Sequence, residues 1–525
     1  MKKNDLFKAI GFVILLYICI SWIVPAIYGI TGTKGDVSHQ IGIVSIVSVL
    51  TSTFSGFSGV VLFVLLVGGF YGVLKVTGAY DKMMNALKKV TYGHETGWLV
   101  GIIIGMAIIA SFTGLDLGLL VVFPFLIGLI GKMGYDKIVA LAATVGATII
   151  GMYGALYANT MYGLNAQILT TTKLGTGILA KIILLVVGVS LLIIFTLIYA
   201  KRNKKAVKLD AKKETVKPVK STAKKTTKKS NAKKPTTNTV KKESEKTKEM
   251  GALPAFITFG VLFLIFILGT TAWTGMFGAE TSIFDKAHKA WTGFSIGGFE
   301  ILNKLFGGIG AFGSWADPNR FATYSMLLIL AMAVITLFYG RSVSKSFEGF
   351  VDGIKSFVVP TVITVLVCAV FVFVYYNPVI NPVTSLLITA TDGFNVALAS
   401  LFTLINSFFY VDYYYLAAST LVQLAQAYTD ATVQSVLSIM FVSLYSVVML
   451  VAPTSLILML GLAISETKYT DWIKFIWILA LILLLVAFIV LMTMAGLIPV
   501  WAGIIIGIVV VAILIAIYAV INHLI

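Results

Sequence analysis

The sequence has 525 residues, of which 58% are hydrophobic and only 12% are charged, about half the charged share of soluble proteins. Repeated, continuous apolar runs of about 20 residues exclude a set of soluble domains and a transmembrane β-barrel, and they predict an all-α polytopic membrane protein. The net charge of +18 is concentrated in residues 201–250, which hold 19 Lys and Arg against 5 Asp and Glu, so it gives no indication of nucleic-acid binding.

The N-terminal part of the chain contains two predicted membrane-spanning segments. Residues 9–30 are apolar and follow three lysines, which favour a cytoplasmic N-terminus. The run is too long for a signal peptide, so we expect a retained helix. Residues 31–56 are expected to form a polar turn and a marginal apolar segment on the outer side. Residues 58–78 are expected to cross back, and 81–95 to lie as an amphipathic stretch on the cytoplasmic surface.

Residues 97–131 contain two apolar arms around a short polar break at 111–116. Each arm is shorter than the roughly 20 residues that span a bilayer, and lysines flank both ends. This pattern predicts a re-entrant hairpin that enters from the cytoplasm, turns inside the membrane and returns. The alternative is one long tilted helix with a glycine kink. Non-helical backbone at that depth needs protein or water partners, and transporters place substrate sites there.

The rest of the first half contains an interrupted crossing. Residues 138–172 are expected to cross outward with a break at 154–160, and 177–199 to return, which completes a first membrane half at 1–200. Residues 201–250 are rich in Lys, Thr and Ser and predict a disordered cytoplasmic loop. This loop is expected to act either as a tether to anionic lipid or as a solvated linker that fixes topology.

The second membrane half is predicted at 251–495. Its first span, 254–272, is expected to cross outward and to lead into a long external loop at 273–320. Residues 321–339 then cross inward to a basic cluster, and 357–376 cross outward. Because lysine and arginine mark cytoplasmic loops, this order keeps the basic cluster inside.

The hairpin pattern recurs in the second half. Residues 385–428 contain two apolar arms around a polar break at 406–412, with flanks that lack lysine, and 432–465 form a second broken span. Both halves therefore read span, hairpin, broken span, span, with opposite orientation. Such inverted-topology repeats are a signature of secondary transporters. Residues 496–525 are expected to add a C-terminal transmembrane helix that ends in the cytoplasm.

The four predicted breaks are expected to converge on one site. Half-helix N-termini suit carboxylates, and freed carbonyls and hydroxyls suit Na⁺. Small and polar residues at the breaks are therefore candidate substrate- or ion-binding residues: Ser111, Thr113, Gly114, Asn159, Thr160, Asn406, Ser407, Pro453, Thr454 and Ser455. The alternative for each of them is close helix packing.

Two carboxylates lie next to the predicted hairpin tips, Asp116 and Asp412. Carboxylates inside a membrane usually serve ion or proton coupling, and the alternative is that both lie at the surface. The sequence contains no P-loop, zinc-ligand spacing or nucleophile elbow. We therefore expect a protein that is not an enzyme and has no cofactor. Its coupling ion is expected to be Na⁺ or H⁺, and no metal other than Na⁺ is expected at the breaks.

Several segments resemble the YfcC/DcuC-type carriers, C4-dicarboxylate-carrier-like proteins of the ion transporter superfamily. The C-terminal segments are Pro453-Thr454-Ser455, Leu460-Gly461-Leu462-Ala463 and the run from Tyr469 to Phe475. The N-terminal segments are Gly68-Gly69-Phe70, the run from Lys75 to Ala79, Phe123-Pro124-Phe125-Leu126 and the run from Gly134 to Val139. The resemblance covers residues 58–200 and 345–495.

The resemblance implies a cation-coupled, elevator-like secondary transporter of a small organic solute, such as a carboxylate or an amino acid, in the plasma membrane. It also implies a homodimer formed through scaffold helices. The family's first tip ends in an acidic pair where this chain has Leu117-Gly118, and its Ser/Gly-rich second tip is Phe408-Phe409-Tyr410 here. These departures leave a second hypothesis, a binding or structural membrane protein that keeps the fold without transport.

Overall fold

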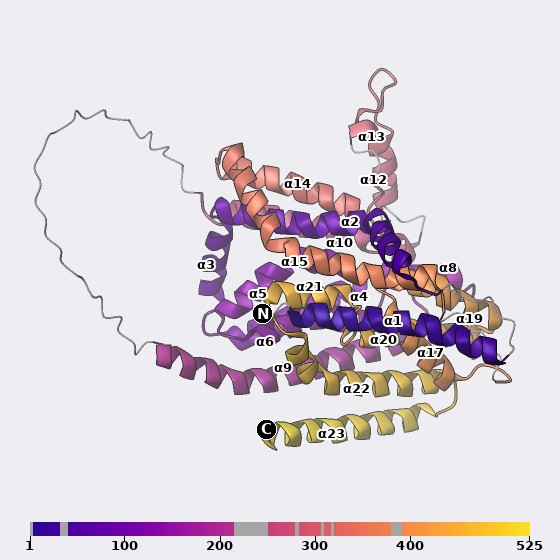
Figure 1. The fold of residues 1–525 in the computed structure, drawn as a ribbon. Coiled ribbons are helices and arrows are strands. Elements are labelled where there is room, and N and C mark those ends of the chain that lie inside the picture. Colours follow the sequence, from indigo (N-terminus) through magenta and orange to yellow (C-terminus); the bar gives the residue numbers. More distant parts are fainter. Residues whose placement is uncertain are drawn as a thin grey trace, which may run out of the picture.

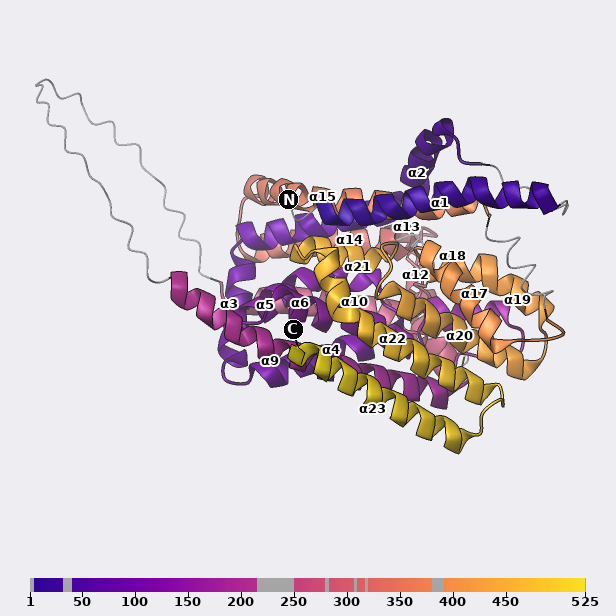
Figure 2. The ribbon, with the colours of Figure 1, turned by 60° about the horizontal axis from the view of Figure 1, so that its bottom comes forward.

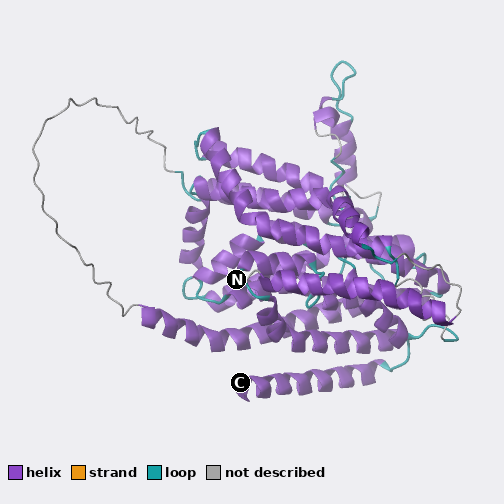
Figure 3. Cartoon of the chain, viewed as in Figure 1, coloured by secondary structure: helices purple, strands orange, loops and turns teal. Residues whose placement is uncertain are grey.

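The computed structural model describes residues 4–31, 40–214, 250–278, 283–305, 309–316, 320–379 and 391–524. Within these ranges the chain folds into helices joined by loops, without β-strands (Figure 3). Nine of the described helices are long and apolar enough to cross a membrane. The predicted all-α polytopic membrane fold is therefore confirmed. Most of the predicted cytoplasmic loop and the first residues of the predicted second hairpin lie outside the described residues.

The first half contains three long helices and a set of shorter, interrupted ones. In chain order they are α1 (Asn4–Thr31), α2 (Ile43–Val76), α3 (Ala79–Thr91), α4 (Glu95–Thr113), η1 (Leu117–Val121), α5 (Phe123–Lys132), α6 (Lys137–Leu141), η2 (Ala142–Gly146), α7 (Ala147–Tyr153), η3 (Asn159–Gly163), α8 (Leu164–Ile168) and α9 (Ile178–Glu214). Helix α9 continues 14 residues into the segment that we predicted to be disordered, because its lysines, alanines and glutamate are good helix formers.

The second half has the same mixture of long and interrupted helices. In chain order they are α10 (Leu253–Thr270), α11 (Trp273–Phe277), α12 (Ile283–Thr292), α13 (Ile301–Leu305), α14 (Arg320–Phe338), α15 (Val343–Tyr376), α17 (Val396–Phe409), α18 (Tyr413–Leu416), η5 (Ala417–Leu421), α19 (Val422–Ala427), α20 (Ala431–Met449), α21 (Leu456–Ser465), α22 (Tyr469–Met494) and α23 (Val500–Leu524).

Helices α4 and α5 form a helical hairpin in the first half, and α4, unlike the short arm predicted from the sequence, is long enough to cross a membrane. Helix α4 ends at Gly114, whose φ of 69° is the left-handed conformation that commonly closes a helix. The chain then passes through η1, and α5 starts with Pro124 in its first turn, where proline needs no hydrogen-bond partner. The hydroxyls of Thr96 and Tyr135 are 3.1 Å apart, so the chain returns to the end at which α4 began.

The second half contains an equivalent turn between α17 and α19. The side chain of Asn395 caps the first turn of α17, and the helix ends at Phe409. The chain turns at residues 410–412 and returns through α18, η5 and α19. The rings of Phe394 and Tyr428 lie 5.2 Å apart, which places the two ends of this turn together.

The two turns approach the middle of the molecule from opposite ends. Helices α3, α5 and α6 lie at one end of the bundle, and α17 and α19 lie at the other, in both views (Figures 1 and 2). Both chain termini lie toward the end that carries α3. The tips of the two turns therefore meet in the interior.

A pair of 34-residue helices, α2 and α15, packs through glycines. A Cβ atom at Gly72 would overlap the carbonyl oxygen of Gly349, and one at Gly353 would overlap the carbonyl oxygen of Gly68. These contacts bring the two backbones together, as small residues do between membrane helices. Helix α14 also packs against α2. We call α2, α14 and α15 the scaffold helices.

Both long scaffold helices exceed their predicted lengths. Residues 43–56, predicted as a marginal outer segment, are helical and continue α2, with a kink at Phe57 where the backbone leaves helical geometry. Helix α15 begins at Val343 rather than near residue 357, because Ser342 caps its first turn. Hydropathy does not show that the segment at 43–56 is continuous with the next span, and the first turns of α15 are too polar to be included in a predicted span.

Candidate functional site

The first tip is joined to the first broken span by hydrogen bonds. The backbone N–H groups of Leu156 and Tyr157 donate to the carbonyl of Ser111 at 2.9 and 3.2 Å. The Ser111 hydroxyl donates to the carbonyl of Gly154, and the Thr160 hydroxyl donates to that of Gly114 at 3.0 Å. The predicted polar residues of this tip thus satisfy backbone groups that the two breaks leave without helical partners.

The second tip is joined to the second broken span in the same manner. The Thr454 hydroxyl donates to the carbonyl of Phe408 at 2.6 Å, and the Tyr445 hydroxyl donates to that of Val411 at 3.2 Å. Asp412 follows directly, and its carboxylate accepts from the backbone of Tyr414 at the start of α18. The carboxylate is therefore fixed at the point where the chain reverses.

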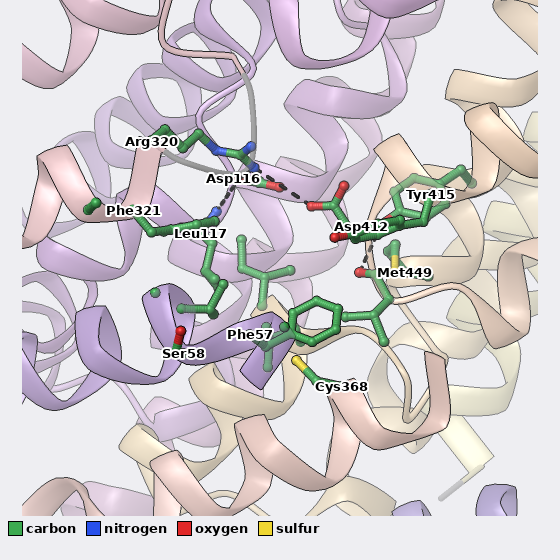
Figure 4. A pocket seen from close by; sticks show the side chains of 18 of the residues that line it. Phe57, Ser58, Asp116, Leu117, Arg320, Phe321, Cys368, Asp412, Tyr415 and Met449 are labelled. Carbon is green, nitrogen blue, oxygen red and sulfur yellow. Dashed lines mark hydrogen bonds and ion pairs between the residues drawn. The ribbon is translucent and has the colours of Figure 1, made fainter. Parts of the chain in front are cut away.

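An arginine lies between the two tips. The Arg320 guanidinium is 3.7 Å from a carboxylate oxygen of Asp116 and 3.7 Å from one of Asp412 (Figure 4). The Arg320 side chain is 4% exposed, whereas the carboxylates are 27% and 28% exposed. A buried guanidinium is costly without acidic partners, and here each hairpin supplies one. Arg320 comes from the first turn of α14, so it connects a scaffold helix to both tips.

A cavity of about 390 Å³ opens beside this ion-pair triad. Its wall combines the two carboxylates and the guanidinium with apolar and aromatic side chains (Figure 4). The kink of α2 contributes Phe57, whose ring packs 5.9 Å from that of Tyr415. Pockets of this size, with few charged groups in an apolar wall, are typical of sites for small ligands. Among the three charged side chains, the net charge is −1.

The structure separates the predicted site residues into two groups. Asp116 and Asp412 line the cavity and contact the same guanidinium. The other ten lie outside the cavity wall at the breaks, where most of them bond backbone carbonyls: Ser111, Thr113, Gly114, Asn159, Thr160, Asn406, Ser407, Pro453, Thr454 and Ser455. Ser111, Thr160 and Thr454 join a tip to a broken span. Thr113, Asn406 and Ser407 instead donate to carbonyls one turn back in their own helices.

Arg320 is a candidate site residue that was not predicted from the sequence. It stood at the boundary between the predicted external loop and the predicted span at 321–339, and was assigned to the loop. A signal was present, because an arginine directly before an apolar span at its outer end departs from the preference for cytoplasmic positive charge. Such a departure indicates an arginine with a partner inside the protein.

Comparison with known proteins places the chain in a family. The profile of the C4-dicarboxylate anaerobic carrier family, DcuC, matches residues 13–496. The chain belongs to the DcuC family. The match confirms the resemblance seen in the sequence. The matched residues include both tips, Arg320 and both broken spans. The DcuC family is a family of membrane transporters, so the cavity lies in a transporter fold.

Individual relatives are more distant. A segment of 146 residues is 27% identical to the putative basic amino acid antiporter YfcC of Escherichia coli, and it covers 28% of this chain and 29% of that relative. The YdaH transporter of Alcanivorax borkumensis aligns over 92% of this chain and 98% of its own, with 14% identity and a TM-score of 0.38. MtrF of Neisseria gonorrhoeae, from a class of antimetabolite efflux pumps, aligns over 92% and 94%, with 12% identity and a TM-score of 0.36.

The bond between Thr454 and the second tip leads to a prediction. Thr454→Val keeps the side-chain shape and removes the donor to the partly buried carbonyl of Phe408, which costs about 1 to 3 kcal/mol. We expect thermal unfolding in detergent to move down by about 2 °C or more. Thr361→Val is the matched control, because the Thr361 hydroxyl bonds only within its own helix. If the unfolding temperatures of the two variants fall equally, the hydrogen bond of Thr454 does not hold the second tip to the broken span.

Proposed function

We propose that this protein is a cation-coupled secondary active transporter that carries a small organic solute, a carboxylate or an amino acid, across the plasma membrane. The observation that carries the proposal is the triad of Asp116, Arg320 and Asp412 at the wall of a 390 Å³ cavity. Membership of the DcuC family supports the transporter class. The N-terminus, the 201–250 loop and the C-terminus are assigned to the cytoplasm on the distribution of lysine and arginine.

The charges of the cavity favour an amino acid over a dicarboxylate. The carboxylate of an amino acid can pair with Arg320, and its ammonium can pair with Asp116 or Asp412. Both charged groups of the solute then face a side chain of opposite charge. A dicarboxylate would bring two negative charges to a triad whose net charge is already −1, and like charges at close range are unfavourable. The printed name of the relative YfcC, a putative basic amino acid antiporter, points in the same direction.

The placement of Arg320 supports an elevator-like mechanism. Arg320 belongs to the scaffold helices, whereas Asp116 and Asp412 belong to the hairpin tips. Movement of the tips and broken spans past the glycine-packed scaffold would break both ion pairs. At 3.7 Å the pairs are longer than direct hydrogen bonds, so a solute can replace them at modest cost. The two halves would then act as inverted repeats around one site.

Counterflow in proteoliposomes tests the proposal. Vesicles loaded with arginine, alanine, aspartate or succinate are diluted into the labelled solute, with Na⁺ or N-methylglucamine outside and with or without a proton gradient. We expect exchange with at least one amino acid to exceed exchange with succinate, and to respond to a cation gradient. Exchange of none of these solutes would favour the second hypothesis, a membrane protein that keeps the fold without transport.

A further inference from the structure

In both halves, the helix that follows the broken span reaches back to the break. In the second half this helix is α22, which starts just after α21. The indole N–H of Trp472 donates to the carbonyl of Leu450 at 2.8 Å, and the Tyr469 hydroxyl donates to the carbonyl of Val451. The carbonyls freed at the second break are therefore capped by two uncharged donors.

In the first half the corresponding helix is α9, and its donor is charged. The ammonium of Lys181, in the first turn of α9, lies 2.6 Å from the carbonyl oxygen of Leu174 and 3.4 Å from that of Leu156. Leu156 is inside the break between α7 and η3. A Cβ atom at Gly154 would overlap the backbone of Leu185, which lies one turn beyond Lys181, so α9 runs directly against the break.

The surroundings of Lys181 match those of a bound monovalent cation. The side chain is fully buried, and its ammonium lies 3.3 Å from the centre of the Tyr162 ring. No carboxylate within the described ranges forms an ion pair with it. Two carbonyl oxygens and an aromatic face remain as its partners. Unwound carbonyls of this kind coordinate the coupling ion in transporters with broken helices, and aromatic faces hold ammonium groups.

We propose that the Lys181 amino group is the built-in occupant of the first break, in the position that an exchangeable Na⁺ would otherwise take. The first break then binds no coupling ion, and the two breaks are functionally unequal. A coupling cation would bind elsewhere, at the second break or at the carboxylates of the cavity. Only this last consequence rests on the proposed transport function, because the occupancy of the first break can be measured without transport.

The decisive experiment is chemical rescue of Lys181→Ala. This variant lacks three methylenes and an ammonium, which is the structure of n-propylammonium. We expect the variant to unfold about 5 °C or more below the unaltered protein, and n-propylammonium chloride to recover about half of that loss, compared with N-methylglucamine chloride at equal ionic strength. NaCl should also stabilise Lys181→Ala more than it stabilises the unaltered protein, since the vacated carbonyls can then hold Na⁺.

Lys181→Met is the matched variant, because it fills the same space without the charge. We expect it to unfold below the unaltered protein and to show no response to n-propylammonium. A methionine variant as stable as the unaltered protein would overturn the proposal, as would an alanine variant that does not respond to n-propylammonium or Na⁺. If the alanine variant does not fold, the unfolding temperatures of Lys181→Met and Lys181→Arg are compared. Lys181→Arg should be the more stable of the two, and the opposite order would overturn the proposal. Rescue in a protein that exchanges no solute would reject the proposed function and leave this inference standing.

Discussion

Arg320→Ala is expected to lower solute exchange by about 10- to 100-fold. The substitution removes the only cationic side chain of the described cavity wall and leaves Asp116 and Asp412 without the guanidinium that neutralises them. Hydrogen bonds to charged groups contribute about 1.5 to 3 kcal/mol, and each 1.4 kcal/mol is a factor of ten in affinity. Counterflow of the best amino acid substrate, measured over a range of concentrations, gives the loss directly.

Two further variants control this experiment. Arg341→Ala removes an exposed arginine just beyond the other end of α14, and we expect exchange to remain unchanged. Arg320→Lys keeps the charge but loses the planar fork that can face two carboxylates, so we expect partial activity with a raised KM. Full exchange by Arg320→Ala, with Arg341→Ala as a reference for expression and folding, would remove Arg320 from the substrate site.

Gly72→Ala is expected to produce the largest loss of stability among conservative substitutions in the scaffold. Its new methyl group would overlap the carbonyl oxygen of Gly349, and because that neighbour is backbone it cannot turn away. Helices α2 and α15 would have to separate over several turns. Overpacking costs about 1 to 3 kcal/mol even where side chains can adjust, and here we expect at least that amount. Thermal unfolding of the purified protein in detergent measures the change.

Gly260→Ala in α10 is the matched control for the scaffold. It makes the same chemical change in another membrane helix, at an exposed position where a Cβ atom would meet no atom within 4 Å. We expect this variant to be as stable as the unaltered protein or slightly more stable, since alanine favours helix over glycine. If Gly72→Ala and Gly260→Ala unfold at the same temperature, close packing of α2 and α15 does not hold the scaffold together.

The architecture was largely predictable from the sequence, and the reason is physical. A membrane requires long apolar runs, so their positions mark the helices, and short apolar arms around a polar centre mark the turns at 111–116 and 406–412. The ends of α2 and α15 were not predictable in this manner. The first turns of α15 are polar and start at the Ser342 cap, and the Ser- and Thr-rich segment at 43–56 joins α2 through a kink at Phe57 that hydropathy does not mark.

The candidate site was only half predictable. Asp116 and Asp412 stood out because intramembrane carboxylates are costly, and both line the cavity. The hydroxyls of Ser111 and Thr454 looked equally suitable for binding a solute, yet each donates to a backbone carbonyl at a break. Sequence alone does not show which polar group satisfies which backbone atom. Arg320 could be assigned only when the fold brought α14 between two tips nearly 300 residues apart.

An experimental density map of the protein with the solute that exchanges fastest in counterflow tests most directly whether the cavity at Arg320 is the substrate site. We expect density for that solute in the cavity between the two tips, with its carboxylate within hydrogen-bond distance of Arg320 and its ammonium facing Asp116 or Asp412. Solute density at another place, with the ion pairs of Arg320 intact and the cavity holding only water, would contradict it.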